Sequence, residues 1–372
     1  MSQVRRSRRA WSPRAASWAL GAAAFLACTT PRPSEPPLES VAPSQPSMLT
    51  PMPGPARGRM EAAVRANDGC VACHADVAAE WRGSLHQRAN IEPAYQRSFA
   101  IEPLPFCRSC HAPEAVSTEE EPEAVSHLGV GCVTCHVTEA EGVLAAPLRS
   151  PAAERSPHAL TRSATFGSAE ACAGCHEFRF PFTRALGKAT LMQSTHSEHA
   201  ESPASGRSCA DCHMPARPGG GRSHRFAASR NPDFLRGAAL ITATRKGVGL
   251  VEVTLTPKDP GHAFPTGDLF RRIEVHAEVE GPDRMSLASS VRYLARHWGF
   301  KPGHVERLLV SDDRVANEPR TVELELGEQA AGREIVWRVA YQRVAHPKGI
   351  DEADAEIEGE VVLAAGRLPA SE

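Results

Sequence analysis

The stretch GCVACHADVAAEWRGSLH, residues 69–86, decides how the N-terminal half of this chain folds. Near its start is a C-x-x-C-H motif, in which Cys70 and Cys73 precede His74. The same pattern begins again at four later cysteines, at positions 107, 132, 172 and 209. Every cysteine pair is therefore followed directly by a histidine, which is the signature of covalent c-type haem attachment.

Two other uses of cysteine pairs fit the pattern less well. A zinc ribbon needs the pairs but not the histidines, and a thioredoxin-type site needs a single pair in another setting. In a haem motif the two thiols bond to the haem vinyl groups, and the adjacent histidine reaches the iron from one face. We therefore predict five covalent haem c groups, held by Cys70, Cys73, Cys107, Cys110, Cys132, Cys135, Cys172, Cys175, Cys209 and Cys212, with proximal ligands His74, His111, His136, His176 and His213.

Composition agrees with a chain that is filled by cofactors. Its 372 residues suggest about two domains. Aromatic residues make up only 5%, and apolar periodicity is patchy across the motif region, so the macrocycles are expected to supply the missing apolar bulk. The formal net charge of -2 gives no basic surface that would indicate nucleic-acid binding.

The N-terminus predicts export. Residues 1–27 combine a basic start with a short apolar run, WALGAAAFLA, which is typical of a signal peptide. Cys28 follows at once and resembles the lipidated cysteine of a bacterial lipobox; ordinary cleavage or an uncleaved anchor are the alternatives. Residues 28–58 are rich in proline and serine and predict an extended tether. The expected location is the periplasm or the outer membrane and cell surface, with a lipid anchor through Cys28.

The remaining chain divides by pattern into two domains, which together predict an α+β fold. Residues 59–236 should form a haem-packed pentahaem domain of short helices and loops, with helices expected at 59–67, 75–89 and 181–200. Residues 237–372 hold no cysteine and alternate polar with apolar side chains in LVEVTLT, IEVHAEVE, TVELELGE and REIVWRVAYQRV. This alternation predicts an antiparallel β-sandwich-like domain.

Each iron has a second axial position, and eleven histidines lie outside the motifs. His276, His297, His304 and His346 belong to the β region and are expected to be solvated or capping residues. Met192 is a weak further candidate. The distal candidates that remain are His86, His127, His158, His196, His199, His224 and His262. His196 and His199 are three residues apart and can share one helix face, so we expect no more than one of them to bind iron.

Several segments resemble the multihaem c-type cytochromes of the hydroxylamine oxidoreductase and nitrification tetrahaem cytochrome superfamily. They are EWRGSLHQRA, GVGCVTCH, CADCHMP with SHRF, and GHAFPTGDLFRR. The resemblance implies distal roles for His86, His158, His224 and His262, and His127 is the fifth choice. Where such relatives carry Thr-Tyr-x-Glu-Trp, this chain has His196 and His199 in place of the two aromatics.

Two functions follow. If every iron has two protein ligands, the protein transfers electrons between redox partners, such as other redox proteins or membrane quinone-linked donors. If one iron is open, it is a haem oxidoreductase for small nitrogen or sulfur compounds. The sequence contains no C-x-x-C-K motif, in which a lysine would ligate the haem iron. Tyr95 is the one tyrosine in the motif region. Electron transfer is the prediction that we prefer.

Overall fold

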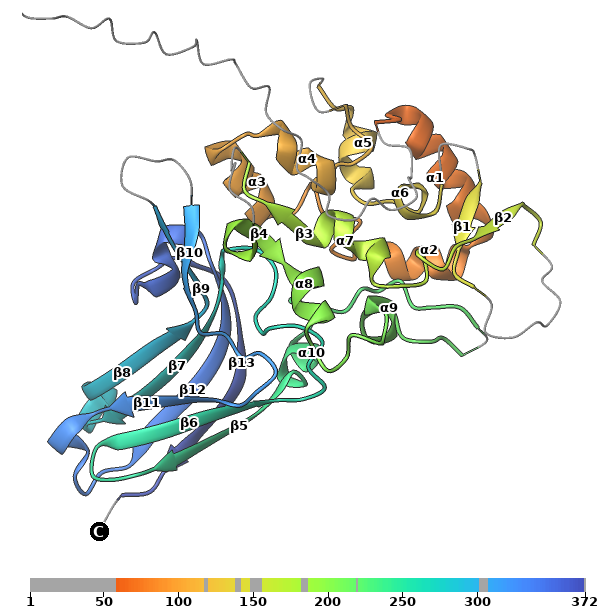
Figure 1. Cartoon of the computed structure of the whole chain (residues 1–372). Coiled ribbons are helices and arrows are strands. Elements are labelled where there is room, and N and C mark those ends of the chain that lie inside the picture. Colours follow the sequence, from red (N-terminus) through yellow and green to blue (C-terminus); the bar gives the residue numbers. More distant parts are fainter. Residues whose placement is uncertain are drawn as a thin grey trace, which may run out of the picture. The chain divides into compact units, whose positions relative to one another are not determined.

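The structure is a computed structural model that describes residues 58–116, 120–137, 142–147, 156–181, 187–218, 220–300 and 307–370. The predicted signal peptide, Cys28 and all of the tether except residue 58 lie outside the described residues. Helices gather in the N-terminal half and strands in the C-terminal half (Figure 1). The predicted α+β class is confirmed.

Short helices dominate the first half. They are α1 (Glu61–Cys73), α2 (Ala75–Trp81), α3 (Pro93–Ile101), α4 (Pro105–His111), α5 (Glu123–Leu128), α6 (Cys132–His136), α7 (Glu170–His176), α8 (Thr195–Ala200), α9 (Cys209–His213) and α10 (Pro232–Arg236). Proline occupies the first turn of α3, α4 and α10, where its missing N–H has no helical partner to lose. Among the described residues, no helix is both long and apolar enough to cross a membrane.

Every C-x-x-C-H motif lies at the C-terminal end of a helix. The helices α4, α6, α7 and α9 each end at the motif histidine, and α1 ends one residue before His74. Residues i, i+3 and i+4 share one face of an α-helix. The helix therefore presents both thiols and the imidazole to the same side, which is the arrangement that a covalently attached haem requires.

Two of the expected helices differ from the sequence prediction. The helix expected at 75–89 ends at Trp81, because Gly83 adopts a left-handed conformation with φ of 78° and turns the chain. Within 181–200, the described residues form β4 (Leu191–Ser194) and then α8. Pairing of β4 with β3 (Glu177–Arg179) replaces the local helical preference.

The second half contains two antiparallel sheets that share one core. The strands are β5 (Ala239–Arg245), β6 (Leu250–Pro257), β7 (Arg271–Glu280), β8 (Ser286–Leu294), β9 (Arg296–Phe300), β10 (Arg307–Asp312), β11 (Arg320–Glu325), β12 (Ile335–Val344) and β13 (Ile357–Leu368). One sheet has the order β11-β6-β5 and the other β13-β12-β7-β8, while β9 and β10 pair separately. The predicted strands at β6, β7, β11 and β12 are confirmed.

Alternation along the strands builds this core. In β6, Val251, Val253 and Leu255 are fully buried while the residues between them are not. They pack against Ile273 and Val275 of β7 in the facing sheet. Burial of side chains of this size contributes about 1.5–3 kcal/mol each. The β half is therefore stabilised by a large apolar core, whereas the apolar clusters of the helical half, such as Ala63, Trp81, Leu128 and Val133, are smaller.

Smaller elements complete the structure. The parallel pair β1 (Val143–Ala145) and β2 (Leu160–Arg162) lies in the helical half. The 3-10 helices are η1 (Lys188–Thr190), η2 (Pro282–Arg284), η3 (Gly327–Ala330) and η4 (Pro347–Asp351).

Candidate haem-binding site

A single cavity of about 2130 Å³ is lined by all ten motif cysteines and all five motif histidines. Ordinary ligand pockets measure roughly 300–1,000 Å³, so the space can hold several macrocycles. Segments of the β half line it too, including residues 257–262 and 264–271. The scarcity of apolar side chains in the helical half is explained by this cavity.

The distance between facing imidazoles tests whether the residues fit haem iron. A metal–nitrogen bond of about 2 Å on each side, plus about 1 Å from each nitrogen to its ring centre, separates two axial rings by about 6 Å. Four motif histidines face a second imidazole at this spacing. The centroid separations are 6.2 Å for His74–His158, 6.2 Å for His176–His86, 6.2 Å for His136–His224 and 6.1 Å for His213–His262.

Hydrogen bonds orient several of these rings. In five of the motif histidines and their facing partners, Nδ1 lies within 3.0 Å of a backbone carbonyl oxygen, which directs Nε2 into the cavity. The pairs are His111 with Ala89 at 2.7 Å, His136 with Leu144 at 2.9 Å, His213 with Ala227 at 2.8 Å, His224 with Arg222 at 2.9 Å and His262 with Ala263 at 3.0 Å. Iron-binding histidines use this arrangement, because the second bond fixes the tautomer and the ring direction.

His86 is positioned by close packing of two segments that were noted in the sequence. Val130 donates its N–H to the carbonyl of His86 at 2.9 Å, and the indole of Trp81 donates to the carbonyl of Val130 at 2.9 Å. A Cβ at Gly129 would lie 2.6 Å from the His86 carbonyl, so only glycine fits there. EWRGSLH and GVGC are thus joined by backbone contacts.

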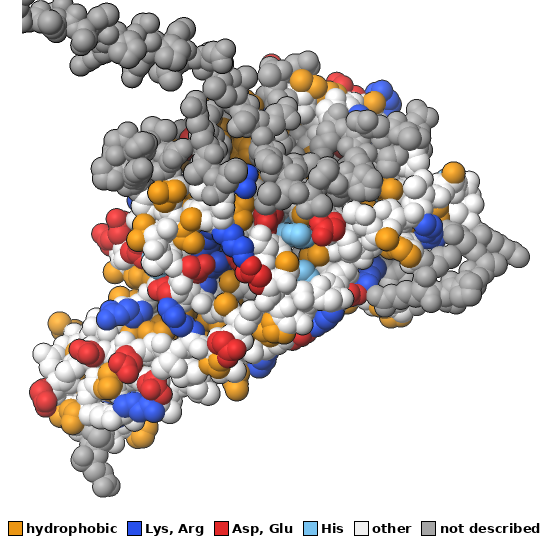
Figure 2. Space-filling model, viewed as in Figure 1, with side chains coloured by type: hydrophobic (Ala, Val, Ile, Leu, Met, Phe, Trp, Pro, Cys, Tyr) orange, Lys and Arg blue, Asp and Glu red, His pale blue; other side chains and the backbone are white. Residues whose placement is uncertain are grey.

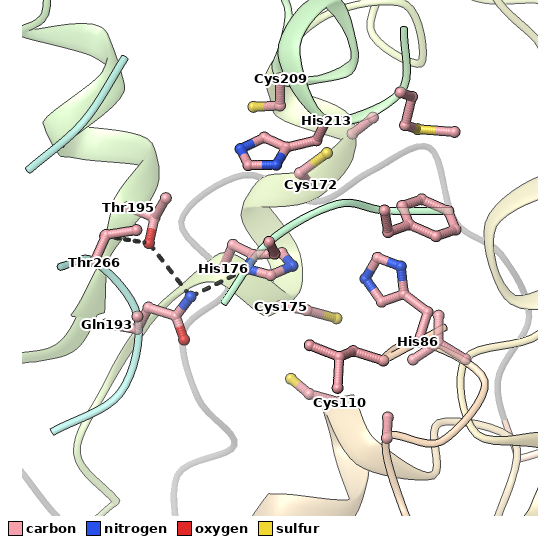
Figure 3. Close-up of a pocket in the computed structure, with 18 of the residues that line it drawn as sticks. His86, Cys110, Cys172, Cys175, His176, Gln193, Thr195, Cys209, His213 and Thr266 are labelled. Atoms are coloured by element: carbon pink, nitrogen blue, oxygen red, sulfur yellow. Dashed lines mark hydrogen bonds between the residues drawn. The ribbon is translucent and has the colours of Figure 1, made fainter. Parts of the chain in front are cut away.

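His86 and His176 form the facing pair with the most strongly lowered pKa values. Burial lowers the pKa of His86 to about 3 and that of His176 to about 4, so both rings are neutral at physiological pH. Neutral imidazole is the form that binds a metal. Figure 3 shows the side-chain amide of Gln193 beside the His176 ring, with 3.1 Å between Gln193 Nε2 and His176 Nδ1. Gln193 is also hydrogen-bonded to Thr195, which is hydrogen-bonded to Thr266. No sequence pattern pointed to Gln193.

His111 differs from the other motif histidines. Among the described residues, no second imidazole faces it at the axial spacing. The ring of Tyr95 instead stacks on it, with centroids 3.8 Å apart and planes inclined by 7°. Burial raises the pKa of the Tyr95 phenol above its usual range, and its buried hydroxyl has no hydrogen-bond partner in the part of the chain that the structure describes. Tyr95 was singled out in the sequence only by its rarity.

Three distal candidates have other surroundings. His127 is exposed and does not line the cavity, and its Nδ1 lies 2.9 Å from the carbonyl of Glu123, which argues against the distal role expected for it. His196 lines the cavity, with Nε2 3.3 Å from Glu170. His199 is buried, and both of its ring nitrogens face carbonyl oxygens. Neither surplus histidine faces a motif imidazole.

The cysteines show which motifs are neighbours. Cys172 and Cys209, from different motifs, are in hydrogen-bonding contact, and Figure 3 shows them on adjacent helices. Cys70 and Cys132 lie near enough to interact electrostatically. Among the described residues, no group of three or more His, Cys, Asp or Glu side chains is arranged to hold a metal ion by itself. The cysteine pairs thus do not converge in the way that zinc ligands do.

Apart from His262, the described histidines of the β half, which are His276, His297 and His346, face no motif imidazole. His346 caps η4, where its Nδ1 accepts the N–H of Lys348 at 3.1 Å. His297 was expected to be solvated or capping, but it lies between Asp313 and Asp351 and is only 17% exposed. His304 lies outside the described residues.

Comparisons with known proteins agree with a c-type cytochrome. Residues 69–137 match the family described as cytochrome c554 and c-prime. The fold resembles the crystal structure of a penta-heme cytochrome c552 from Thermochromatium tepidum, with a TM-score of 0.61 and 19% identity over 81% of this chain and 97% of that one. A search of curated proteins finds no match. The family match covers the first three motifs, and the structural likeness shows that the fold is shared along most of the chain.

Proposed function

We propose that the chain is an exported cytochrome that carries five covalent haem c groups and transfers electrons between redox partners. The observation that carries the proposal is the spacing of about 6 Å between imidazoles in His74–His158, His176–His86, His136–His224 and His213–His262. Haem iron supplies one-electron chemistry when bound. The role of the chain would be to hold four of the five irons between two imidazoles and so to close them to substrates.

Neighbouring motifs support a path for electrons. The thioether sulfurs lie at the edge of each haem, so contact between Cys172 and Cys209 brings two macrocycle edges together. The proximity of Cys70 to Cys132 does the same for the first and third motifs. His111 and His176 also interact electrostatically, which places the second motif beside the fourth. Five centres in one cavity make each transfer step short.

The surface indicates where a partner could exchange electrons. His74 and His158, the facing pair of the first motif, are both exposed. We propose the haem of this motif as a point of electron exchange with a partner. On the face drawn in Figure 2, basic and acidic side chains are interspersed. We propose other redox proteins or membrane quinone-linked donors as partners, and location in the periplasm or at the outer membrane through a lipid on Cys28.

The test is to produce the chain in a host that attaches c-type haem and to determine its intact mass. The proposal expects the processed chain plus five haem groups and a reduced spectrum dominated by low-spin haem. A mass with fewer haems, or predominantly high-spin haem, would contradict it.

A second function rests on His111, which no imidazole faces among the described residues. An iron held there would have His111 as its one imidazole ligand from the described residues, and its second axial position could bind small nitrogen or sulfur compounds. The test is to titrate the protein with nitrite, hydroxylamine and sulfite while recording its spectrum and any turnover. Spectral shifts limited to one haem, with turnover that is lost when Cys107 and Cys110 are replaced by Ala, would favour this enzyme activity over electron transfer alone.

A further inference from the structure

His199 is buried in α8 and bridges two loops. Its Nδ1 lies 2.9 Å from the carbonyl oxygen of Gly261, and its Nε2 lies 2.9 Å from the carbonyl oxygen of Arg207. Only 8% of the residue is exposed. Because each ring nitrogen faces an oxygen, no lone pair of His199 is directed at an iron. Its task must lie in the two loops that it joins.

Those loops carry the two histidines of one facing pair. Arg207 lies two residues before Cys209, where α9 begins and leads to His213. Gly261 directly precedes His262. The rings of His213 and His262 are 6.1 Å apart and inclined by only 11°. One imidazole thus contacts both sides of the site at which a haem attached to Cys209 and Cys212 would lie.

Glu198, the neighbour of His199, holds the same loop from the other side of His262. Its Oε2 accepts the N–H of Ala263 at 3.3 Å and the hydroxyl of Thr266 at 2.8 Å. Its Oε1 forms an ion pair with Arg314 at 2.7 Å. The backbone is therefore fixed at the residues on both sides of His262. A flexible loop would hold an axial ligand less firmly, because its ordering would oppose the iron bond.

We propose that His199 is a positioning residue that fixes His262 over the iron of the haem attached to Cys209 and Cys212. The proposal rests on the paired-histidine ligation given under Proposed function. It assigns to His199 a role that the sequence did not indicate, since His199 was there a candidate ligand itself. His199 connects the β half, which supplies His262, with the segment that supplies His213.

The experiment compares variants of the haem-loaded protein. His199→Phe removes both polar contacts and keeps a ring, whereas His199→Gln can keep one of them. His196→Gln is the matched control, since it removes an imidazole from the same helix without touching either loop. His262→Ala is the reference for complete loss of the ligand. The readouts are the rate and stoichiometry of carbon monoxide binding to the reduced protein and the reduction potentials of its haems.

A closed iron binds carbon monoxide only after His262 leaves, so the binding rate reports how often the loop opens. Loss of one buried hydrogen bond changes such an equilibrium by about tenfold. We expect His199→Phe to accelerate carbon monoxide binding at one haem by about tenfold or more and to shift the potential of that haem alone. His199→Gln should fall between this variant and the wild type, and His196→Gln should match the wild type.

The outcomes separate the two proposals. If His262→Ala opens no additional haem, the paired ligation itself is wrong at this motif. If His262→Ala opens one haem but His199→Phe and His199→Gln both behave like His196→Gln, the ligation stands and the positioning role of His199 is refuted. Because haem content is measured in each variant, failure to fold is recognised as lost haem rather than as an altered ligand.

Discussion

Replacing His224 by Ala should open one iron without releasing its haem. The His224 ring faces His136 with centroids 6.2 Å apart, and its Nδ1 lies 2.9 Å from the carbonyl oxygen of Arg222. Its backbone N–H donates to Glu80 at 2.8 Å. The haem would stay attached through Cys132 and Cys135. The number of haems per chain is therefore unchanged, while one of the four facing histidine pairs is lost.

The expected carbon monoxide stoichiometry follows from the number of facing histidine pairs. The wild type should bind about one carbon monoxide per chain, at the haem of His111, whereas His224→Ala should bind about two. The paired low-spin signal should fall by about one quarter, since one pair of four is removed. The assay is titration of the reduced protein with carbon monoxide, with haem content measured on the same sample.

His127→Ala is the matched control for this substitution. His127 is also a histidine outside the motifs, but it is exposed and does not line the cavity. Its removal should leave the stoichiometry at the wild-type value. The reasoning is refuted if His224→Ala binds no more carbon monoxide than the wild type, or if His127→Ala opens a haem.

Three further predictions concern other parts of the chain. Replacing Cys107 and Cys110 by Ala should leave four haems and abolish carbon monoxide binding, as measured by intact mass and titration; undiminished binding would contradict an open iron at this motif. Leu255→Ala in the fully buried core of the β half should lower the free energy of unfolding by about 2–5 kcal/mol in a denaturant titration; a loss below 1 kcal/mol would contradict the core packing. The hydrogen bond to Asp313, and then its charge and that of Asp351, raise the pKa of His297 above its usual 6.5. The pair therefore stabilises the fold fully below pH 6.5 and loses this contribution as the pH rises through the folded pKa. His297→Gln should accordingly lower the stability by roughly 0.2–1 kcal/mol at pH 5.5 and by less at pH 9, measured by thermal unfolding at both values; an equal loss at both would exclude the charged pair.

The motif helices and the central strands could be predicted from sequence because both depend on local patterns. The C-x-x-C-H spacing places Cys209, Cys212 and His213 on one helix face whatever surrounds them, and the alternation in β6 is visible in the letters. Helix ends were less predictable. The segment at β4 forms a strand because β3 pairs with it, and no local pattern shows that pairing.

The distal positions could be predicted only in part. Resemblance to related cytochromes pointed to His86, His158, His224 and His262, and the structure brings each of them opposite a motif histidine. The part played by His199 could not be read in advance, because it depends on loops 54 residues apart in the chain that meet only after folding (Arg207 to Gly261). Spacing alone suggested a ligand where the structure shows a bridge between loops.

Electron paramagnetic resonance of the oxidised protein tests the central claim most directly. Low-spin haems with nearly perpendicular axial imidazoles give signals with a large maximal g value, and those with nearly parallel imidazoles give rhombic signals. The ring planes are inclined by 64° in His74–His158 and by 75° in His176–His86, but by 31° in His136–His224 and 11° in His213–His262. We predict two low-spin haems of each kind and a fifth without paired-imidazole character at the His111 motif. A spectrum dominated by high-spin haem, or by one kind of low-spin signal alone, would contradict the account.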